Sequence, residues 1–244
     1  MEQLQKMTLG VIGGLGPIAT AHFMELVIRM TEAGTDQEHL DMIIYNRPSI
    51  PDRTSYILDP TKPNPLPEMI RTGNALARQG AGLIAIPCMT AHYFHADLTR
   101  YIEAPIVHAI HETAVHLKKH GITTAGIMAT DGTIRSRLFQ EELLKHGITP
   151  VIPGEKGQKC VMSVIYDDIK AGLPAGMDKF DYAAKDLHDQ GAQAIILGCT
   201  ELSLVKRDYP IGAGYLDAME VLAEVCVRTC GAKLKEEYQN LISK

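Results

Sequence analysis

Residues 79–88 read Q-G-A-G-L-I-A-I-P-C, and residues 190–199 read Q-G-A-Q-A-I-I-L-G-C, so one short pattern occurs twice in the chain. In each copy an apolar run leads through proline or glycine to a cysteine, which is typical of a fully buried parallel strand. Cys88 and Cys199 would then lie just beyond the carboxyl ends of their strands. Ligands bind at this edge of open α/β sheets, because loops there carry chemistry while the strands hold them rigidly. The repeat therefore predicts two thiols that face one shared crevice.

A second pair of matching segments indicates that the chain is duplicated. Residues 8–18 read T-L-G-V-I-G-G-L-G-P-I and residues 124–134 read T-A-G-I-M-A-T-D-G-T-I, with nearly the same separation as the cysteine segments. We predict an α/β protein of two pseudo-twofold-related domains, each a parallel four-stranded sheet flanked by helices, with the active site in the cleft between them. The first domain would comprise residues 1–111 and 212–244, and the second residues 112–211. A final helix after residue 215 would pack back on the first domain.

Composition restricts the class of protein. The chain has 244 residues, 45% of them hydrophobic and 22% charged, and a formal net charge of -5. This composition is ordinary for a soluble globular protein, and without a basic patch neither nucleic acid nor an anionic membrane is an expected partner. Residues 1–7 lack the features of a signal peptide, and no apolar run approaches the roughly 20 residues that cross a bilayer. We predict a cytoplasmic protein whose five cysteines are thiols and not disulfides.

A glycine-rich turn, G-G-L-G-P at residues 13–17, separates a predicted strand at 8–12 from a helix at 18–30. Backbone N–H groups in such a turn can hold an anion at the helix N-terminus. The spacing differs from the dinucleotide fingerprint, and the next strand ends at Tyr45 and Asn46 and not at an acidic residue. The turn is therefore interpreted as a site for a small carboxylate or as a purely structural feature.

The segment that follows the strand at residues 41–45 reads N-R-P-S-I-P-D-R-T at residues 46–54. Three prolines, Pro48, Pro51 and Pro60, predict a long ordered loop without regular secondary structure at residues 46–60, at the active edge. Arg47 and Arg53 are candidates for a carboxylate clamp, because guanidinium binds carboxylate through two hydrogen bonds. For Arg47, a surface ion pair with a nearby acid is the alternative.

The remaining elements follow from hydrophobic spacing. Further strands are predicted at residues 105–108, 124–128 and 149–152, and helices at residues 66–79, 89–101, 112–120, 159–171 and 179–190, with one more helix ending at residue 146.

Six motifs occur in one order along the chain, namely G-G-L-G-P, N-R-P-S-I-P-D-R-T, P-C-M-T-A-H, A-T-D-G-T-I, I-K-A-G and G-C-T-E-L. In this order they resemble the aspartate/glutamate racemases, which are pyridoxal-independent enzymes with a two-cysteine site. The resemblance extends from residue 8 to about residue 224. It implies interconversion of L- and D-aspartate, with glutamate as a further candidate, by a homodimer that needs no cofactor and no metal.

The chemistry of the two thiols agrees with this resemblance. Inversion of a carbon centre through a planar carbanion needs a base on one face and an acid on the other, and two identical groups serve both directions. By analogy with the family, Cys199 would act on the L-enantiomer and Cys88 on the D-enantiomer. Two buried structural thiols are the alternative interpretation.

The resemblance also assigns substrate-binding residues. Arg53 and Lys170 match the family positions that bind the side-chain carboxylate, and together they would offset the cost of removing that carboxylate from water. The α-carboxylate and amino group would be bound by Thr90, Thr130, Thr133 and Thr200. Leu15, Met89 and Glu201 complete the expected substrate-binding set.

Met89 departs from the family, which usually has Asn after the first cysteine. A thioether cannot donate a hydrogen bond, so one substrate contact would be lost or replaced by water or backbone. We therefore predict weaker substrate binding than in an Asn-bearing relative. Met89→Asn is expected to change the Michaelis constant and turnover, and unchanged constants would contradict this prediction.

Other features leave alternatives open. Cys226 and Cys230 have helical spacing but no partners at metal-site spacing, so we interpret them as core or surface thiols, and Cys160 has no chemical context. His92, His108 and His111 either tune a thiol or pack. Two other functions remain: an isomerase or lyase of the same superfamily acting on maleate, hydantoins or arylmalonates, which Arg53 and Lys170 disfavour, or a catalytically impaired amino-acid-binding protein, which Met89 makes conceivable.

Overall fold

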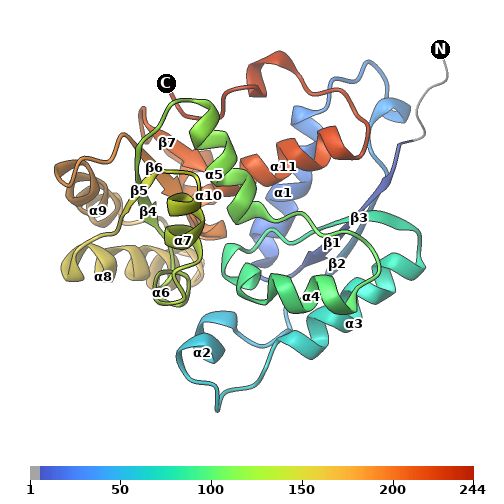
Figure 1. The fold of residues 1–244 in the computed structure, drawn as a ribbon, viewed down its shortest axis with the longest axis horizontal. Helices are drawn as coiled ribbons and strands as arrows, with labels where there is room; N and C mark the ends of the chain where they lie inside the picture. The colour runs from blue at the N-terminus through green and yellow to red at the C-terminus, as the bar shows by residue number, and fades with distance from the viewer. Residues whose placement is uncertain (1–5) are drawn as a thin grey trace.

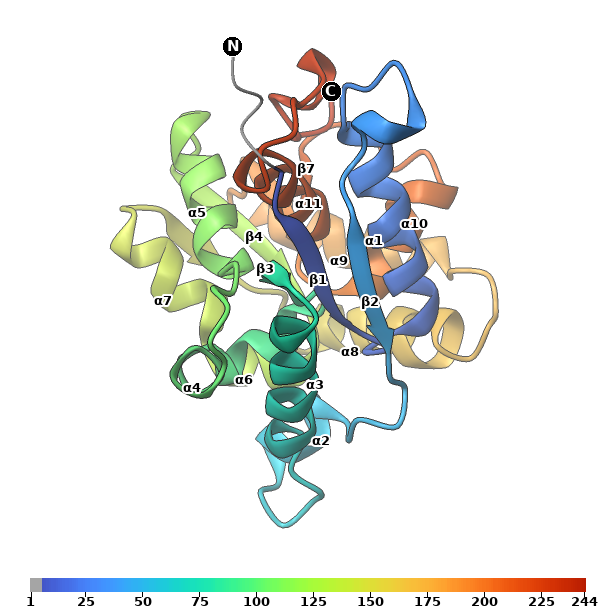
Figure 2. The ribbon, with the colours of Figure 1, turned by 90° about the vertical axis from the view of Figure 1, so that its right-hand side faces the viewer.

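The computed structural model describes residues 6–244, so most of the segment considered for a signal peptide lies outside it. Two parallel sheets form the framework (Figures 1 and 2). The first has the order β2-β1-β3 and the second the order β5-β4-β6-β7. Their strands are β1 (Thr8–Gly13), β2 (Met42–Asn46), β3 (Ala81–Ala85), β4 (Thr124–Met128), β5 (Thr149–Val151), β6 (Ala194–Leu197) and β7 (Tyr215–Asp217). The predicted α/β fold with two parallel sheets is confirmed.

The first sheet has three strands, whereas four were predicted. The predicted strand at residues 105–108 is reduced to one isolated parallel bridge between Ile84 and Ile106. Pro105 has no N–H to donate, and His108 already serves as the N-cap of the next helix. Only the Pro105 carbonyl and the Val107 N–H therefore pair with Ile84, at 2.8 and 3.0 Å.

Helices flank both sheets (Figure 1). The α-helices are α1 (Pro17–Met30), α2 (Arg53–Leu58), α3 (Leu66–Arg78), α4 (His95–Tyr101), α5 (Ala109–Lys119), α6 (Asp131–Arg135), α7 (Leu138–Lys145), α8 (Glu155–Ser163), α9 (Met177–Asp189), α10 (Thr200–Asp208) and α11 (Ala218–Thr229). Short 3₁₀ segments are η1 (Asp36–Glu38), η2 (Met89–Phe94) and η4 (Glu236–Tyr238), and η3 (Val164–Ile169) is a π-helix. No helix among residues 6–244 combines the length and apolar character needed to span a bilayer.

Helix α2 corrects the prediction of an irregular loop at residues 46–60. Its prolines all lie outside the helix, so none interrupts its hydrogen bonds. Asp52 is the N-cap, and its Oδ1 accepts a hydrogen bond from the Ser55 N–H at 2.7 Å. This cap begins the helix at Arg53 and thereby fixes the position of that residue.

Helix α11 packs against α1 and α5 in the region between the two sheets (Figure 1). One core cluster joins residues of both sheets, including Val11 of β1, Ile127 of β4 and Leu222 of α11. Within the segment 212–244, which we assigned to the first domain, β7 pairs with β6 of the second sheet. The predicted domain boundaries stay a proposal, since α11 contacts both α1 and α5 while β7 extends the second sheet.

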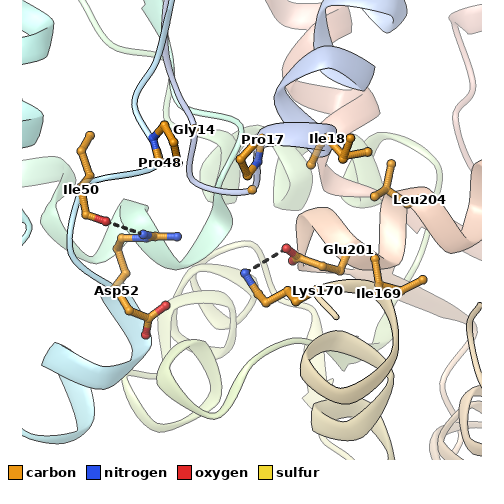
Figure 3. A pocket seen from close by; sticks show the side chains of 13 residues that line it. Gly14, Pro17, Ile18, Pro48, Ile50, Asp52, Ile169, Lys170, Glu201 and Leu204 are labelled. Atoms are coloured by element: carbon orange, nitrogen blue, oxygen red, sulfur yellow. Dashed lines mark hydrogen bonds and ion pairs between the residues drawn. The ribbon is translucent and has the colours of Figure 1, made fainter. Parts of the chain in front are cut away.

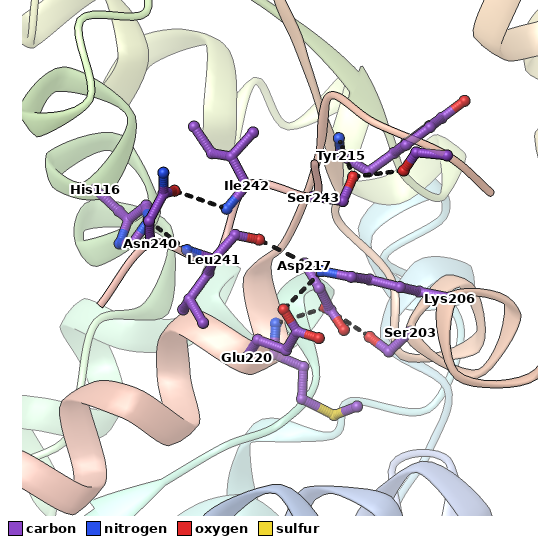
Figure 4. Close-up of polar contacts among 12 residues, drawn as sticks. His116, Ser203, Lys206, Tyr215, Asp217, Glu220, Asn240, Leu241, Ile242 and Ser243 are labelled. Carbon is purple, nitrogen blue, oxygen red and sulfur yellow. Dashed lines mark hydrogen bonds and ion pairs between the residues drawn. The ribbon is translucent and has the colours of Figure 1, made fainter. Parts of the chain in front are cut away.

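A buried polar cluster anchors the C-terminal segment (Figure 4). Lys206 Nζ forms an ion pair with Glu220 Oε2 at 2.7 Å, and Ser203 donates a hydrogen bond to Asp217 Oδ1 at 2.7 Å. Burial, together with the negative charge of Asp217, raises the pKa of Glu220 to about 7. The carboxyl group of Glu220 therefore changes its charge near neutral pH.

We expect Glu220→Gln to flatten the pH dependence of stability. The pKa of Glu220 is about 7 in the folded chain and 4.5 as the ordinary value. The folded state therefore binds this proton more tightly than the unfolded state does. The resulting stabilisation of the folded state is fully present below the unfolded pKa, and it is lost as the pH rises through 7. The corresponding loss is on the order of 3 kcal/mol. Denaturant unfolding at pH 5 and pH 8 measures it, and parallel pH dependences for the wild type and variant would contradict this assignment.

Candidate active site

The two repeated cysteines lie where their strands end. Cys88 follows β3 and is the N-cap of η2, and Cys199 follows β6 and is the N-cap of α10. Both side chains are buried and line one small cavity of about 10 Å³, which has room for roughly one water molecule. The cavity is also lined by Leu15, Asp52, Arg53, Thr54, Met89, Thr90, Thr130, Tyr166, Lys170, Thr200 and Glu201. Segments from both halves of the chain therefore converge on the two thiols.

Among the catalytic and substrate-binding residues that the resemblance implies, Thr133 alone does not line this cavity. Its hydroxyl lies 2.9 Å from the Thr90 hydroxyl and 3.2 Å from that of Thr130. Thr54 donates a hydrogen bond to Thr130 at 3.2 Å, so a buried network of threonine hydroxyls lies beside the cavity. Thr133 therefore orients Thr90 and Thr130 from outside the cavity, because its hydroxyl is hydrogen-bonded to both of their hydroxyl groups.

Three lining residues were absent from the predicted set. Asp52 and Thr54 flank Arg53 in the P-D-R-T motif, and Tyr166 lies four residues before Lys170 in η3. The sequence could have indicated these three residues only through their closeness to Arg53 and Lys170. Burial raises the pKa of Tyr166 to about 12, so its hydroxyl stays protonated as a hydrogen-bond donor.

Arg47 does not reach this cavity. Its Nη2 lies 3.3 Å from Glu68 Oε2, and its Nη1 donates to the Thr72 hydroxyl at 3.4 Å. The surface ion pair considered from the sequence is therefore the arrangement observed, and Arg53 is the arginine of this loop that lines the site.

Arg53 is a buried cation beside Cys88. Its Nη1 donates to the Pro51 carbonyl at 3.1 Å, while its Nε is buried without a hydrogen-bond partner among the described residues. Burial acts to lower the pKa of Arg53, but the negative charges of a Cys88 thiolate and of Asp52 outweigh it and raise the pKa. Arg53 therefore stays charged next to Cys88 and retains an unused donor.

Cys199 lies in a different electrostatic environment. Its Sγ donates a hydrogen bond to Glu201 Oε2 at 2.9 Å, and the Thr200 hydroxyl donates to the same oxygen at 2.8 Å. Burial, and then the charge of Glu201, raise the pKa of the Cys199 thiol well above its ordinary value. The arrangement therefore holds the proton on Cys199 while a cation lies beside Cys88.

Lys170 completes the charged set. Its Nζ forms an ion pair with Glu201 Oε1 at 2.9 Å, which Figure 3 shows as a dashed line. Burial acts to lower the pKa of Lys170, but the charges of Glu201 and Cys199 raise it. Glu201 thus contacts Lys170 through one carboxylate oxygen and Cys199 through the other.

A larger cavity of about 350 Å³ lies outside the small one (Figure 3). The two cavities share Asp52, Arg53, Lys170 and Glu201, so these four residues separate the buried thiols from the outer space. The outer lining otherwise consists of small and apolar residues: Gly14, Gly16, Pro17, Ile18, Ala19, Pro48, Ile50, Ile169 and Leu204. A ligand that approaches from outside meets the charged residues before it meets the cysteines.

The glycine-rich turn needs glycine for close packing at this place. Gly14 has a φ of 85°, and a Cβ there would lie 2.3 Å from the Arg47 backbone nitrogen. Gly16 has a φ of 118°, and a Cβ at this residue would be 3.2 Å from the Thr200 hydroxyl oxygen. The turn therefore brings the first half of the chain against the C-T-E segment of the second.

Known proteins resemble this chain over nearly its full length. The Asp/Glu/hydantoin racemase family profile matches residues 12–226. A broad-specificity amino-acid racemase of Bacillus subtilis is 28% identical over 230 residues, which cover 91% of this chain and 97% of that protein. The structure of an aspartate racemase of Picrophilus torridus is similar with a TM-score of 0.86 and 28% identity, covering 96% and 99% of the two chains.

A more distant structure shares the fold. Glutamate racemase from Francisella tularensis, solved with D-glutamate, has a TM-score of 0.67 at 18% identity and covers 93% of this chain and 81% of its own. The match of the family profile to most of the chain, together with these relatives, shows that this chain is a member of the Asp/Glu/hydantoin racemase family, in the class of isomerases that act on amino acids.

Proposed function

We propose that this enzyme interconverts the enantiomers of an acidic amino acid, aspartate first and glutamate second, without a cofactor and with one cysteine on each face of the α-carbon. The supporting observation is that Cys88 and Cys199 line one cavity together with Arg53 and Lys170. Two cations beside two thiols suit a substrate with two carboxylates. We further propose that the enzyme acts in the cytoplasm as a homodimer.

The proton transfer uses the two thiols in turn. One thiolate removes the α-proton, and the electron pair of the broken C–H bond is delocalised into the α-carboxylate. The opposite thiol then donates its proton to the other face of the carbon, so one thiolate is consumed and one is produced. Thr90, Thr130 and Thr200 line the cavity, and their hydroxyl groups would stabilise the developing charge on the carboxylate. When Cys199 holds its proton, Cys88 is the thiol that would act as the base. By family analogy, this protonation state accepts the D-enantiomer.

Substrate binding requires the small cavity to widen. Aspartate has nine non-hydrogen atoms and exceeds a space of about 10 Å³. Asp52, Arg53, Lys170 and Glu201 form the boundary with the outer cavity, so they are the residues that have to separate. A substrate carboxylate that pairs with Lys170 would compensate for the loss of the Glu201 ion pair.

A second candidate is racemisation of amino acids with neutral or basic side chains. The Lys170 to Glu201 ion pair favours it, because the charge of Lys170 is already balanced before a substrate arrives. Asp52 and Glu201 also place two acidic groups against the two cations of the boundary. The two candidates differ in the side-chain charge that the enzyme prefers.

Incubation in deuterium oxide without pyridoxal phosphate tests the proposal. We expect L-aspartate to lose its optical rotation and to gain deuterium at the α-carbon, because the donating thiol exchanges with solvent. Asparagine, alanine and lysine, assayed in parallel, distinguish the two candidates. Racemisation of these three but not of aspartate would reject the acidic substrate, and no exchange in any amino acid would reject the racemase activity.

Glu201→Gln is expected to shift the alkaline limb of the pH profile. The reaction needs one thiolate and one thiol, so activity falls as the pH rises through the pKa of the second thiol, Cys199. Burial and Glu201 raise that pKa, and removal of the Glu201 charge lowers it. We expect the alkaline limb of kcat/KM to move down by about one pH unit.

The matched control is Glu201→Asp, which keeps the charge and should keep a limb closer to that of the wild type. Racemisation followed by polarimetry from pH 6 to pH 11 provides the profiles. Superimposable profiles for the wild type and Glu201→Gln would show that Glu201 does not control the thiol.

A further inference from the structure

Three potential metal ligands converge between helices α5 and α7, away from the two cysteines. They are His111 of α5, Glu142 of α7 and His146 at the C-cap of α7, and their ligand atoms all lie within 4.8 Å of one another. None of the three lines the cavity of Cys88 and Cys199. The sequence indicated no metal site here, because His111 is far along the chain from the other two.

One carboxylate oxygen is the centre of this cluster. Glu142 Oε1 lies 2.7 Å from His111 Nδ1 and 3.4 Å from His146 Nε2. Its other oxygen, Oε2, accepts a hydrogen bond from Lys145 Nζ at 2.9 Å. Lys145 therefore holds the carboxylate so that Oε1 points toward the two imidazole rings, as an outer partner of a metal ligand would.

One distance between the three potential ligands equals that of a zinc site, and a second is shorter. Zinc lies about 2.0 to 2.1 Å from nitrogen and oxygen ligands, so neighbouring ligands in a tetrahedral site are about 3.3 to 3.4 Å apart. The distance from Glu142 to His146 already has this value, at 3.4 Å. The distance from Glu142 to His111 has to open from 2.7 Å, a movement that an exposed imidazole on a helix surface can make.

Helix α7 contributes two of the three potential ligands. Glu142 and His146 are four residues apart, which places them on one face at the end of α7. The partial negative charge of a helix C-terminus also favours a cation there.

We propose that His111, Glu142 and His146 form a binding site for a zinc-like divalent metal ion that joins α5 to α7. Two imidazole nitrogens and one carboxylate oxygen are ligands that zinc binds, with water in the fourth position. The His111 side chain is 46% exposed, which leaves a path for the ion and space for that water. The bound ion takes the place of the direct contacts between Glu142 and the two imidazole rings, and it stabilises the folded chain by mass action.

Zinc binding to purified protein tests this site. The thiols are competing ligands, so the measurements use a Cys88→Ser/Cys199→Ser background as well as the wild type. We expect one equivalent of zinc by competition with a chromogenic chelator and a higher unfolding temperature in zinc. Cobalt at the same site is expected to give visible d–d absorption without a thiolate charge-transfer band.

Two substitutions and two controls locate the ion. In that background His111→Ala and His146→Ala each are expected to weaken zinc binding at least about tenfold, since even outer-shell changes cost 10- to 100-fold. Lys145→Ala removes the ion pair with Glu142 but no ligand, so it is expected to weaken zinc binding less than either histidine substitution. His188→Ala controls for the number of histidines.

Zinc binding that survives both His111→Ala and His146→Ala would overturn the site, as would the absence of bound zinc in the parent. Zinc binding that Lys145→Ala weakens as much as His111→Ala and His146→Ala do would show an ion-pair cluster and not a metal site. Circular dichroism of each variant verifies that loss of binding does not come from unfolding.

Discussion

Cys88→Ala and Cys199→Ala are each expected to reduce racemisation of aspartate at least about 10³-fold, since a positioned acid or base contributes 10²- to 10⁴-fold and inversion needs both. The two thiols line one cavity, so loss of either one leaves a face of the α-carbon without a proton donor or acceptor. The assay is the loss of optical rotation of each enantiomer.

Isotope exchange separates the roles of the two thiols. A single remaining thiol can remove the α-proton and return deuterium to the same face, which exchanges hydrogen without inversion. By family analogy, Cys199→Ala should still exchange D-aspartate and Cys88→Ala should still exchange L-aspartate. Cys160→Ala is the matched control, because Cys160 does not line the cavity, and it should racemise normally. Racemisation that survives either catalytic substitution would refute the two-base mechanism.

Arg53→Met is expected to reduce kcat/KM for aspartate at least about 30-fold. Removal of one partner from a buried charge pair costs about 2 to 5 kcal/mol, and 1.4 kcal/mol corresponds to tenfold. The Nε of Arg53, which is buried and has no hydrogen-bond partner among residues 6–244, is the donor that we propose for the substrate side-chain carboxylate. The variant Arg53→Lys keeps the charge without the planar guanidinium and should recover only part of the loss.

The preference for aspartate over asparagine isolates the contribution of Arg53 to substrate choice. The two amino acids have the same shape and differ in side-chain charge, so effects of Arg53 on Cys88 or on the loop alter both alike. We expect the wild type to prefer aspartate and Arg53→Met to lose most of that preference. An unchanged ratio would indicate that the side-chain carboxylate binds elsewhere, and thermal unfolding verifies that the variant folds.

Hydrophobic patterns predicted the framework because burial is encoded locally. The apolar runs before Cys88 and Cys199 form β3 and β6, and the repeat at residues 8–18 and 124–134 forms β1 and β4. Every strand that was predicted beside these appears as well, except the one at residues 105–108. There the backbone chemistry of Pro105 and the cap at His108 shortened the pairing to one bridge.

Proline content misled the prediction for residues 46–60. The segment between Pro51 and Pro60 is long enough for a short helix, and the N-cap Asp52 begins this helix. Asp52 is an N-cap residue that can be recognised in the sequence, whereas the surrounding prolines indicated an irregular loop. The same helix presents Asp52 and Thr54 to the cavity on either side of Arg53, so the error in secondary structure accompanied the two missed lining residues.

The amino-acid sequence was sufficient to identify two cysteines at the ends of duplicated buried strands, because strand burial and the turns that follow depend on neighbouring residues. Only the tertiary structure decided how the charges are paired: Glu201 binds both Cys199 and Lys170, Arg53 lies beside Cys88, and Arg47 pairs with Glu68. Except for Cys199 and Glu201, which are two residues apart, these pairings join residues far apart in the chain, and their strength depends on burial and on distances of a few ångströms. No local pattern carries that information, so the electrostatic environment of each thiol is a property of the folded chain.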